Sequence, residues 1–132
     1  MATAPVYTAT PKVGLAEVST ANTNRDGTGT IAAIFTAGAS GSRIERIMVK
    51  ATGTTTAGMV RLFIHDGSSA RLYTELPVQA NVPSASLRTF ESTLEGITTP
   101  HLLPLVLPVG YSLRASTHNA ETFIVSAIGG DF

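Results

Sequence analysis

Two short polar segments hold the side chains of this sequence that could act in catalysis. His65 is followed by Asp66, and His118 is followed by Asn119. A histidine and a carboxylate activate a serine when the three side chains converge in the fold. Serines are numerous in this chain, so such a pairing arises easily by chance, and a histidine beside an Asp-Gly turn is more simply a residue that flanks the turn. We therefore predict no catalytic residues and no enzyme activity.

The other side chains that could bind a metal ion or a cofactor follow no recognised motif. The histidines His65, His101 and His118 are far apart, with none of the close spacings at which histidines hold zinc. The acidic residues do not follow the spacing of a calcium-binding loop. The small-residue segment 52–58 lacks the lysine and the helix of a phosphate-binding loop. We expect no metal ion and no cofactor.

The chain ends in four residues, Gly129-Gly130-Asp131-Phe132, whose letters match the signature of diguanylate cyclases. Those enzymes are larger α/β domains that carry the signature on an internal hairpin. Here it follows a β-rich sequence, so we interpret these four residues as a tail of small residues after the last strand.

Composition and charge favour a protein whose surface is partly covered by partners. Charged residues make up 14% of the 132 residues and the formal net charge is zero, whereas ordinary soluble domains contain about 25% charged residues. A surface with so little charge associates readily. Seven of the nine basic residues are arginine, which is enriched at protein interfaces. The alternative, that these arginines simply occupy the solvent faces of strands, stays open.

The charge balance and the residue composition argue against several classes of protein. A balanced charge argues against a nucleic-acid partner, because such proteins carry a basic excess. No apolar run reaches the length of a membrane-spanning helix, and the first 14 residues lack the order of a signal peptide. The absence of cysteine excludes disulfide bonds and thiolate metal sites.

The clearest structural pattern lies between Gly41 and Gly67. Two apolar runs, 43–51 and 58–65, flank a connector of Thr, Gly and Ala, and we predict that they form one long hairpin in the core. Ile44 is out of phase with Ile47, so either both faces of this strand are covered or a bulge shifts its register.

Similar short runs, about eight or nine in all, recur along the chain with turn residues every eight to twelve positions and without helical spacing. This pattern predicts an all-β fold, an antiparallel β-sandwich of about eight strands, and the strand count favours a jelly roll. Residues 1–14, interrupted by Pro5 and Pro11, are predicted to form an extended N-terminal arm, and residues 15–132 the sandwich domain.

Two blocks of the sequence resemble a known family. They are FTAGASGSRIERIMVKATGTTTAGMVRLFIHDG, from Phe35 to Gly67, and LPVGYSLRASTHNAETFIVSAIGGDF, from Leu107 to Phe132. Together they cover a little under half of the chain and resemble small proteins encoded among the structural genes of tailed bacteriophages and prophages. The resemblance implies a virion component, with capsid decoration (cement) as the favoured role for a domain of this size. It implies no catalytic residue.

The resemblance also implies partners and a location. Decoration proteins of this kind bind the major capsid protein on the outer capsid surface of the virion, are made in the host bacterial cytoplasm, and form homo-oligomers, for which a trimer is favoured over a dimer. The residues that we expect at subunit or capsid contacts are Arg43, Arg46, Arg61 and Arg88. The alternative is a receptor- or glycan-binding module of a phage spike or fibre, with Tyr73 and Tyr111 as the platforms for a sugar.

Overall fold

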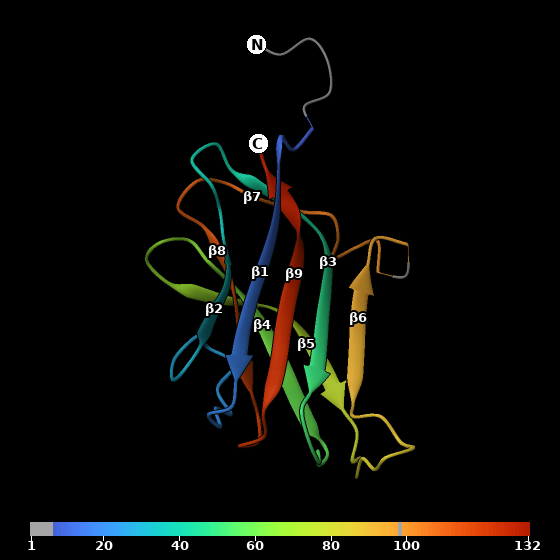
Figure 1. Ribbon diagram of the computed structural model, residues 1–132. Coiled ribbons are helices and arrows are strands. Elements are labelled where there is room, and N and C mark those ends of the chain that lie inside the picture. The colour runs from blue at the N-terminus through green and yellow to red at the C-terminus, as the bar shows by residue number, and fades with distance from the viewer. Residues whose placement is uncertain (1–6, 98) are drawn as a thin grey trace.

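The described residues form two antiparallel β-sheets that pack face to face and contain no helix (Figure 1). The computed structural model describes residues 7–97 and 99–132. The strands are β1 (Thr10–Val18), β2 (Ala32–Thr36), β3 (Ser42–Ala51), β4 (Gly58–His65), β5 (Ala70–Val78), β6 (Glu91–Glu95), β7 (Leu105–Leu107), β8 (Ser112–Thr117) and β9 (Phe123–Asp131). No helix in this part of the chain is long and apolar enough to cross a membrane.

The strand order separates the chain into two interleaved sets. The first sheet has the order β1-β9-β3-β6. Two short strands pair with the same edge of β3: β6 pairs with residues 46–50 and β7 pairs with residues 42–44. The second sheet has the order β2-β8-β4-β5. The predicted antiparallel β-sandwich is confirmed. Its assignment as a jelly roll stays a prediction, and the interleaved order is compatible with it.

The prediction of one long hairpin from residues 43–51 and 58–65 is wrong. These residues form β3 and β4, which belong to different sheets and lie in the interior of each. Their connector crosses the sandwich and is fixed at Thr55, whose hydroxyl donates to the Gln79 carbonyl oxygen at 2.7 Å. Alternation in a sequence indicates which face of a strand is buried, and it does not indicate which strand lies beside it.

A β-bulge in β3 explains the change of phase between Ile44 and Ile47. Ile44 pairs with Gly129, while Arg46 pairs with the preceding residue of β9, Ile128, so the strand accommodates one additional residue. Both isoleucines are therefore fully buried. Of the two explanations that the sequence left open, the bulge is confirmed.

The last glycines belong to β9 and do not form a tail. At the bulge the two backbones approach so closely that a Cβ atom added to Gly129 would lie 1.8 Å from the Arg43 carbonyl oxygen. Gly130 pairs with Arg43 on one side and with Pro11 on the other. The interpretation of these small residues as a tail is therefore wrong, because the glycines provide the space that this pairing needs.

The sandwich begins earlier in the chain than predicted, because β1 begins at Thr10. Residues 10–14, assigned to the arm from the sequence, pair with β9, so the sandwich includes them and does not begin at residue 15. Pro11 is tolerated there because β1 is an edge strand. Residues 1–6 lie outside the described residues, and the arm remains a prediction for them.

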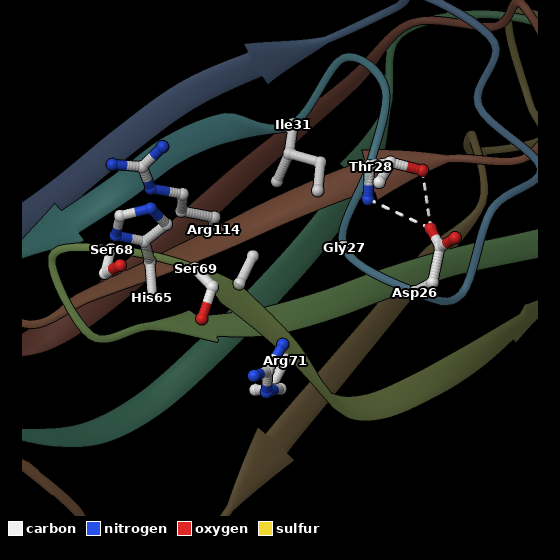
Figure 2. A pocket seen from close by; sticks show the side chains of 10 residues that line it. Asp26, Gly27, Thr28, Ile31, His65, Ser68, Ser69, Arg71 and Arg114 are labelled. Carbon is white, nitrogen blue, oxygen red and sulfur yellow. Dashed lines mark hydrogen bonds between the residues drawn. The ribbon is translucent and has the colours of Figure 1, made fainter.

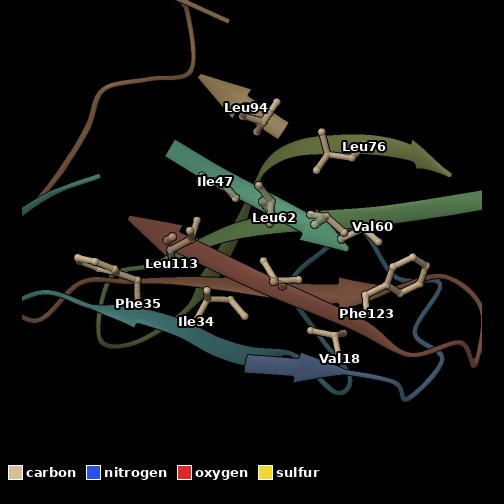
Figure 3. Close-up of a cluster of buried hydrophobic side chains, with 14 of the residues drawn as sticks. Val18, Ile34, Phe35, Ile47, Val60, Leu62, Leu76, Leu94, Leu113 and Phe123 are labelled. Atoms are coloured by element: carbon tan, nitrogen blue, oxygen red, sulfur yellow. The ribbon is translucent and has the colours of Figure 1, made fainter. Parts of the chain in front are cut away.

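The inner faces of the two sheets meet in one apolar core (Figure 3). Its fully buried members include Ile47, Val49 and Val125 from the first sheet and Val60, Leu62 and Leu113 from the second. At one end the rings of Phe90 and Phe123 meet edge to face, with centroids 6.3 Å apart. This core fixes which residues of each strand point outward, and those outward residues make up the candidate site.

Candidate functional site

The outer face of the second sheet is covered by the connection 19–31 between β1 and β2. Arg61 points away from the core residues of β4, yet its side chain is only 1% exposed. Its Nη1 donates to the Asn22 carbonyl oxygen at 3.3 Å and its Nε donates to Glu75 Oε2 at 3.0 Å. Arg25 Nε donates to the same carboxylate oxygen at 2.8 Å. The connection is thus attached to the sheet through a carboxylate that two arginines share.

The buried guanidinium of Arg61 determines the chemistry of this cluster. Its Nη2 lies 3.1 Å from His118 Nδ1, and because arginine only donates, that ring nitrogen is the acceptor. The hydrogen bond from Arg25, followed by that from Arg61, holds the pKa of Glu75 below its usual range. Arg61 is therefore a structural residue. The sequence predicts Arg61 at an interface; in the structure the connection 19–31 covers it, which alternation alone does not show.

The outer face of the first sheet carries exposed apolar side chains. Directly paired residues of neighbouring strands lie on the same face of a sheet, and Val13 pairs with Ile128 while Leu15 pairs with Ser126. Ser126 pairs in turn with Met48. Val13 is 63% exposed and Leu15 is 65% exposed. We call the patch formed by Val13, Leu15, Met48, Ile124 and Ile128 the open face.

Charged side chains border the open face along β3. The bulge places Arg43 and Arg46 on the same side of the strand, and Lys50 follows on that side. Arg43 Nε pairs with Glu45 Oε1 at 2.5 Å, and Lys50 Nζ pairs with Glu91 Oε1 at 3.3 Å. Arg46 Nε is buried and has no hydrogen-bond partner among the described residues. The face therefore combines apolar side chains on β1, β9 and β3 with charged side chains on β3.

The structure separates the four arginines predicted at contacts. Arg43 and Arg46 lie together beside the open face, whereas Arg61 is buried under the other sheet. Arg88 is exposed in the connection that precedes β6, where its carbonyl oxygen accepts from Asn81 Nδ2 at 2.9 Å. Two of the four thus share one surface.

Sequence reasoning missed the apolar side chains of the open face, although β9 carries a signal for them. This strand alternates two apolar sets, with Phe123, Val125 and Ala127 in the core and Ile124 and Ile128 outside it. A strand that is apolar on both faces indicates that its outer face is also a contact surface. Val13 could not be placed on this face from the sequence, because the arm predicted for residues 1–14 includes it.

The histidines that could serve catalysis do not come together. His65 lies at the end of β4 and His118 follows β8, and because these strands are antiparallel the two residues lie at opposite ends of the pair. Asp66 accepts from the backbone nitrogens of Ser68 and Ser69 at 2.9 and 2.8 Å, and these bonds lower its pKa. Among the residues that the structure describes, no group of three or more His, Asp or Glu side chains is arranged to hold a metal ion.

The aspartate of the C-terminal Gly-Gly-Asp-Phe sequence joins three strands. Asp131 Oδ1 lies 3.2 Å from Lys12 Nζ of β1 and accepts from the Ser42 hydroxyl of β3. Ser42 Oγ in turn accepts from the Gly38 backbone nitrogen at 2.9 Å. The hydrogen bond from Ser42, followed by that from Lys12, lowers the pKa of Asp131 below its usual 3.8.

This pKa shift predicts how acid affects the sandwich. A carboxylate whose pKa is lowered by folding stabilises the protein above its unfolded pKa, and that contribution is lost as the pH falls through the folded pKa. Asp131→Asn should therefore be less stable than the wild type at neutral pH, and the difference should shrink as the pH falls below 3.8. Urea unfolding of both proteins across this range measures it. A difference that stays constant with pH would contradict the assignment.

A scan of the chain against protein-family models finds no match, and a search of curated proteins finds none either.

Proposed function

We propose that this chain is a non-enzymatic structural protein of a tailed-phage virion that decorates the outer capsid. The observation that carries the proposal is the open face. A sheet face with two apolar side chains more than three-fifths exposed, Val13 and Leu15, is typical of a surface that another protein covers. Its partner on this proposal is the major capsid protein.

The composition of the open face suits contact with a protein. Protein interfaces have an apolar centre and a polar border, and arginine is enriched in them. Here Leu15 and Met48 lie on either side of Ser126 across the middle of the face, and Arg43 and Arg46 lie on β3. Glu17 lies at one end of β1. The exposed residues of this face lie on three neighbouring strands, so the face fits an extended contact with a protein shell.

The family resemblance supports the virion role, and the two blocks that carry it include strands of the open face. The block Phe35 to Gly67 contains β3 and β4, and the block Leu107 to Phe132 contains β8 and β9. These are the central strands of the two sheets. The open-face residues Met48, Ile124 and Ile128 lie within the two blocks, so the resemblance extends to the middle of the proposed contact.

When many copies of the protein attach to one capsid, each single contact can be weak. A homo-oligomer, with a trimer favoured over a dimer, presents several open faces to a symmetric shell, and linked contacts raise the overall affinity by orders of magnitude. On this proposal the protein is made in the host bacterial cytoplasm and attaches to the capsid there.

A charge placed on the open face tests the proposal. Leu15→Glu should weaken binding to capsids at least about tenfold, because the contact would bury a carboxylate without a partner. Since Leu15 is 65% exposed in the free protein, the free energy of unfolding should change by less than about 0.5 kcal/mol. Binding is measured by co-sedimentation with capsids assembled without this protein.

Val82→Glu is the matched control. Val82 is 70% exposed in the connection between β5 and β6, away from the open face. This variant should bind capsids as the wild type does. Equal binding by Leu15→Glu and Val82→Glu would exclude the open face as the contact, and no binding by the wild type would overturn the decoration role.

The alternative, a glycan-binding module of a spike or fibre, loses its two expected platforms. The Tyr73 hydroxyl donates to the Leu102 carbonyl oxygen, and Tyr111 packs against the apolar core. Both rings are half-buried, so each has less free surface for a sugar than an exposed ring would have. The alternative is therefore less well supported than the decoration role.

A further inference from the structure

A crevice of about 380 Å³ lies where β4 ends (Figure 2). β4 and β8, which contribute His65 and Arg114 to it, belong to the second sheet, whereas the open face belongs to the first. Its walls come from the connection 26–31, the turn between β4 and β5, and Arg114 of β8. These segments are far apart in the sequence. Protein sites for small ligands have about 300–1,000 Å³, so the crevice has room for a ligand of monosaccharide size.

The walls of the crevice are fixed without a ligand. Gly27 has a φ of 86°, and a Cβ atom added to it would lie 2.3 Å from the Ala70 carbonyl oxygen, so the backbone of the connection rests directly on β5. On the opposite wall, the Asp66 carboxylate holds the turn through the backbone nitrogens of Ser68 and Ser69. A site with both walls fixed loses little conformational entropy when a ligand binds.

Several hydrogen-bond donors lining the crevice have no acceptor among the described residues. Arg114 Nε donates to Ser112 Oγ at 3.1 Å, which leaves the two terminal nitrogens of its guanidinium free. His65 Nδ1 accepts from the Gly67 backbone nitrogen at 3.0 Å, so the neutral ring carries its proton on Nε2. Figure 2 shows the Arg114 and His65 side chains next to each other on one side of the crevice. Together they offer a paired donor site for a carboxylate or a phosphate.

Charge is distributed unevenly over the crevice. Arg114 and His65 lie on one side, the exposed Arg71 lies below them, and Asp26 lies on the far side (Figure 2). Asp26 Oδ1 accepts from the Thr28 backbone nitrogen at 3.1 Å and from its hydroxyl at 2.5 Å, which lowers the pKa of Asp26. Asp26 therefore stays a carboxylate, and its second oxygen has no partner in the described part of the chain.

We propose that this crevice binds an acidic monosaccharide unit, a sugar that carries a carboxylate. The sugar carboxylate would accept from Arg114 and His65, and a ring hydroxyl would donate to the free oxygen of Asp26. Ile31 lies above the space between the Arg114 and His65 pair and Asp26, and it offers an apolar contact for the sugar ring (Figure 2). The combination is selective, because a neutral sugar leaves the guanidinium unpaired and an inorganic anion does not reach Asp26.

This site is distinct from the open face and does not depend on the decoration role. A protein attached to a capsid by the first sheet would leave the crevice of the second sheet accessible, where it could contact acidic polysaccharide on a bacterial surface.

Titration of the isotope-labelled protein with single compounds, followed by NMR chemical shifts, tests the proposal. Glucuronic acid should shift the amide signals of Gly27, Thr28 and Gly67, whereas glucose and inorganic phosphate should shift them far less at the same concentration. Arg114→Gln should weaken glucuronic acid binding at least about tenfold, because a hydrogen bond to a charged group is lost. Arg88→Gln, which removes an exposed arginine outside the crevice, should bind as the wild type does.

Three outcomes would overturn the proposal. The first is an absence of shifts around the crevice with glucuronic acid. The second is equal binding of glucose or of inorganic phosphate, which would exclude selection of an acidic sugar. The third is equal binding by Arg114→Gln and Arg88→Gln, which would exclude the guanidinium as the anchor; an unchanged amide spectrum of each free variant ensures that folding is not the cause.

Discussion

Gly129→Ala should destabilise the protein by about 3 kcal/mol, the upper range for a residue forced into a filled space. The added Cβ atom would lie 1.8 Å from the Arg43 carbonyl oxygen and 2.9 Å from the Ile44 Cα atom. Both are backbone atoms, which cannot rotate away as the end of a side chain can. To accommodate the methyl group, β3 and β9 would have to separate at the bulge, and the hydrogen bonds of the first sheet would be lost there. Guanidinium unfolding of the wild type and the variant measures the difference.

Gly53→Ala is the matched control for this substitution. Gly53 lies in the connection between β3 and β4, and a Cβ atom added there would meet no atom within 4 Å. The same chemical change should therefore alter the free energy of unfolding by less than about 0.5 kcal/mol. If Gly129→Ala proved as mild as Gly53→Ala, the close approach of β3 and β9 at the bulge would be refuted.

The second large effect concerns the carboxylate that Arg25 and Arg61 share. Glu75→Gln should destabilise the protein by about 2–3 kcal/mol, because it leaves a buried guanidinium without its counter-charge. This loss of stability is smaller than that for a fully buried ion pair, because the Glu75 side chain is 27% exposed. Arg61→Met should cost about 1 kcal/mol, since it removes the buried charge itself and leaves the Asn22 carbonyl and His118 without a donor.

The order of these two effects is the informative result. Chemical unfolding of both variants should place Glu75→Gln as the less stable protein, with Arg25→Gln close to the wild type, because the Arg25 side chain is 59% exposed. An Arg61→Met variant that is clearly less stable than Glu75→Gln would mean that the arginine acts by packing and not as a buried charge that needs its partner.

The class of fold could be predicted because even short strands alternate between core residues and outward residues. Val60 and Leu62 lie two residues apart in the apolar run 58–65, which is the spacing of one face of a strand, and both are fully buried. Pro77 has no backbone N–H to donate to a neighbouring strand, which favours a sheet edge, and β5 is an edge strand. Neighbouring strands could not be predicted, since the connection 52–57 has turn-like composition whether it joins two strands of one sheet or crosses between sheets.

The candidate sites were less accessible to sequence reasoning because each depends on chain segments that are distant in sequence. Arg61 is an outward residue by alternation, and only the fold shows the connection 19–31 above it. The crevice needs Arg114 beside His65, which are 49 residues apart in the sequence but lie on neighbouring strands of the second sheet. A tight turn after His65 was predicted, but its place beside β8 was not.

The open face connects these results with function. The second sheet is covered on its outer side by its own chain, whereas the first sheet exposes Val13 and Leu15. A protein that covers one sheet and leaves the other apolar is suited to attach through the uncovered one. On this account the crevice and the buried Arg61 cluster belong to the side that faces away from the capsid.

Cryo-electron microscopy of virions that contain this protein is the most direct test of the account. If the open face binds the capsid, density for the sandwich lies on the outer capsid, with β1, β9 and β3 against the major capsid protein. The crevice at His65 and Arg114 then faces solvent. Density for the sandwich with the open face toward solvent, or its location on the tail and not on the capsid, would contradict the account.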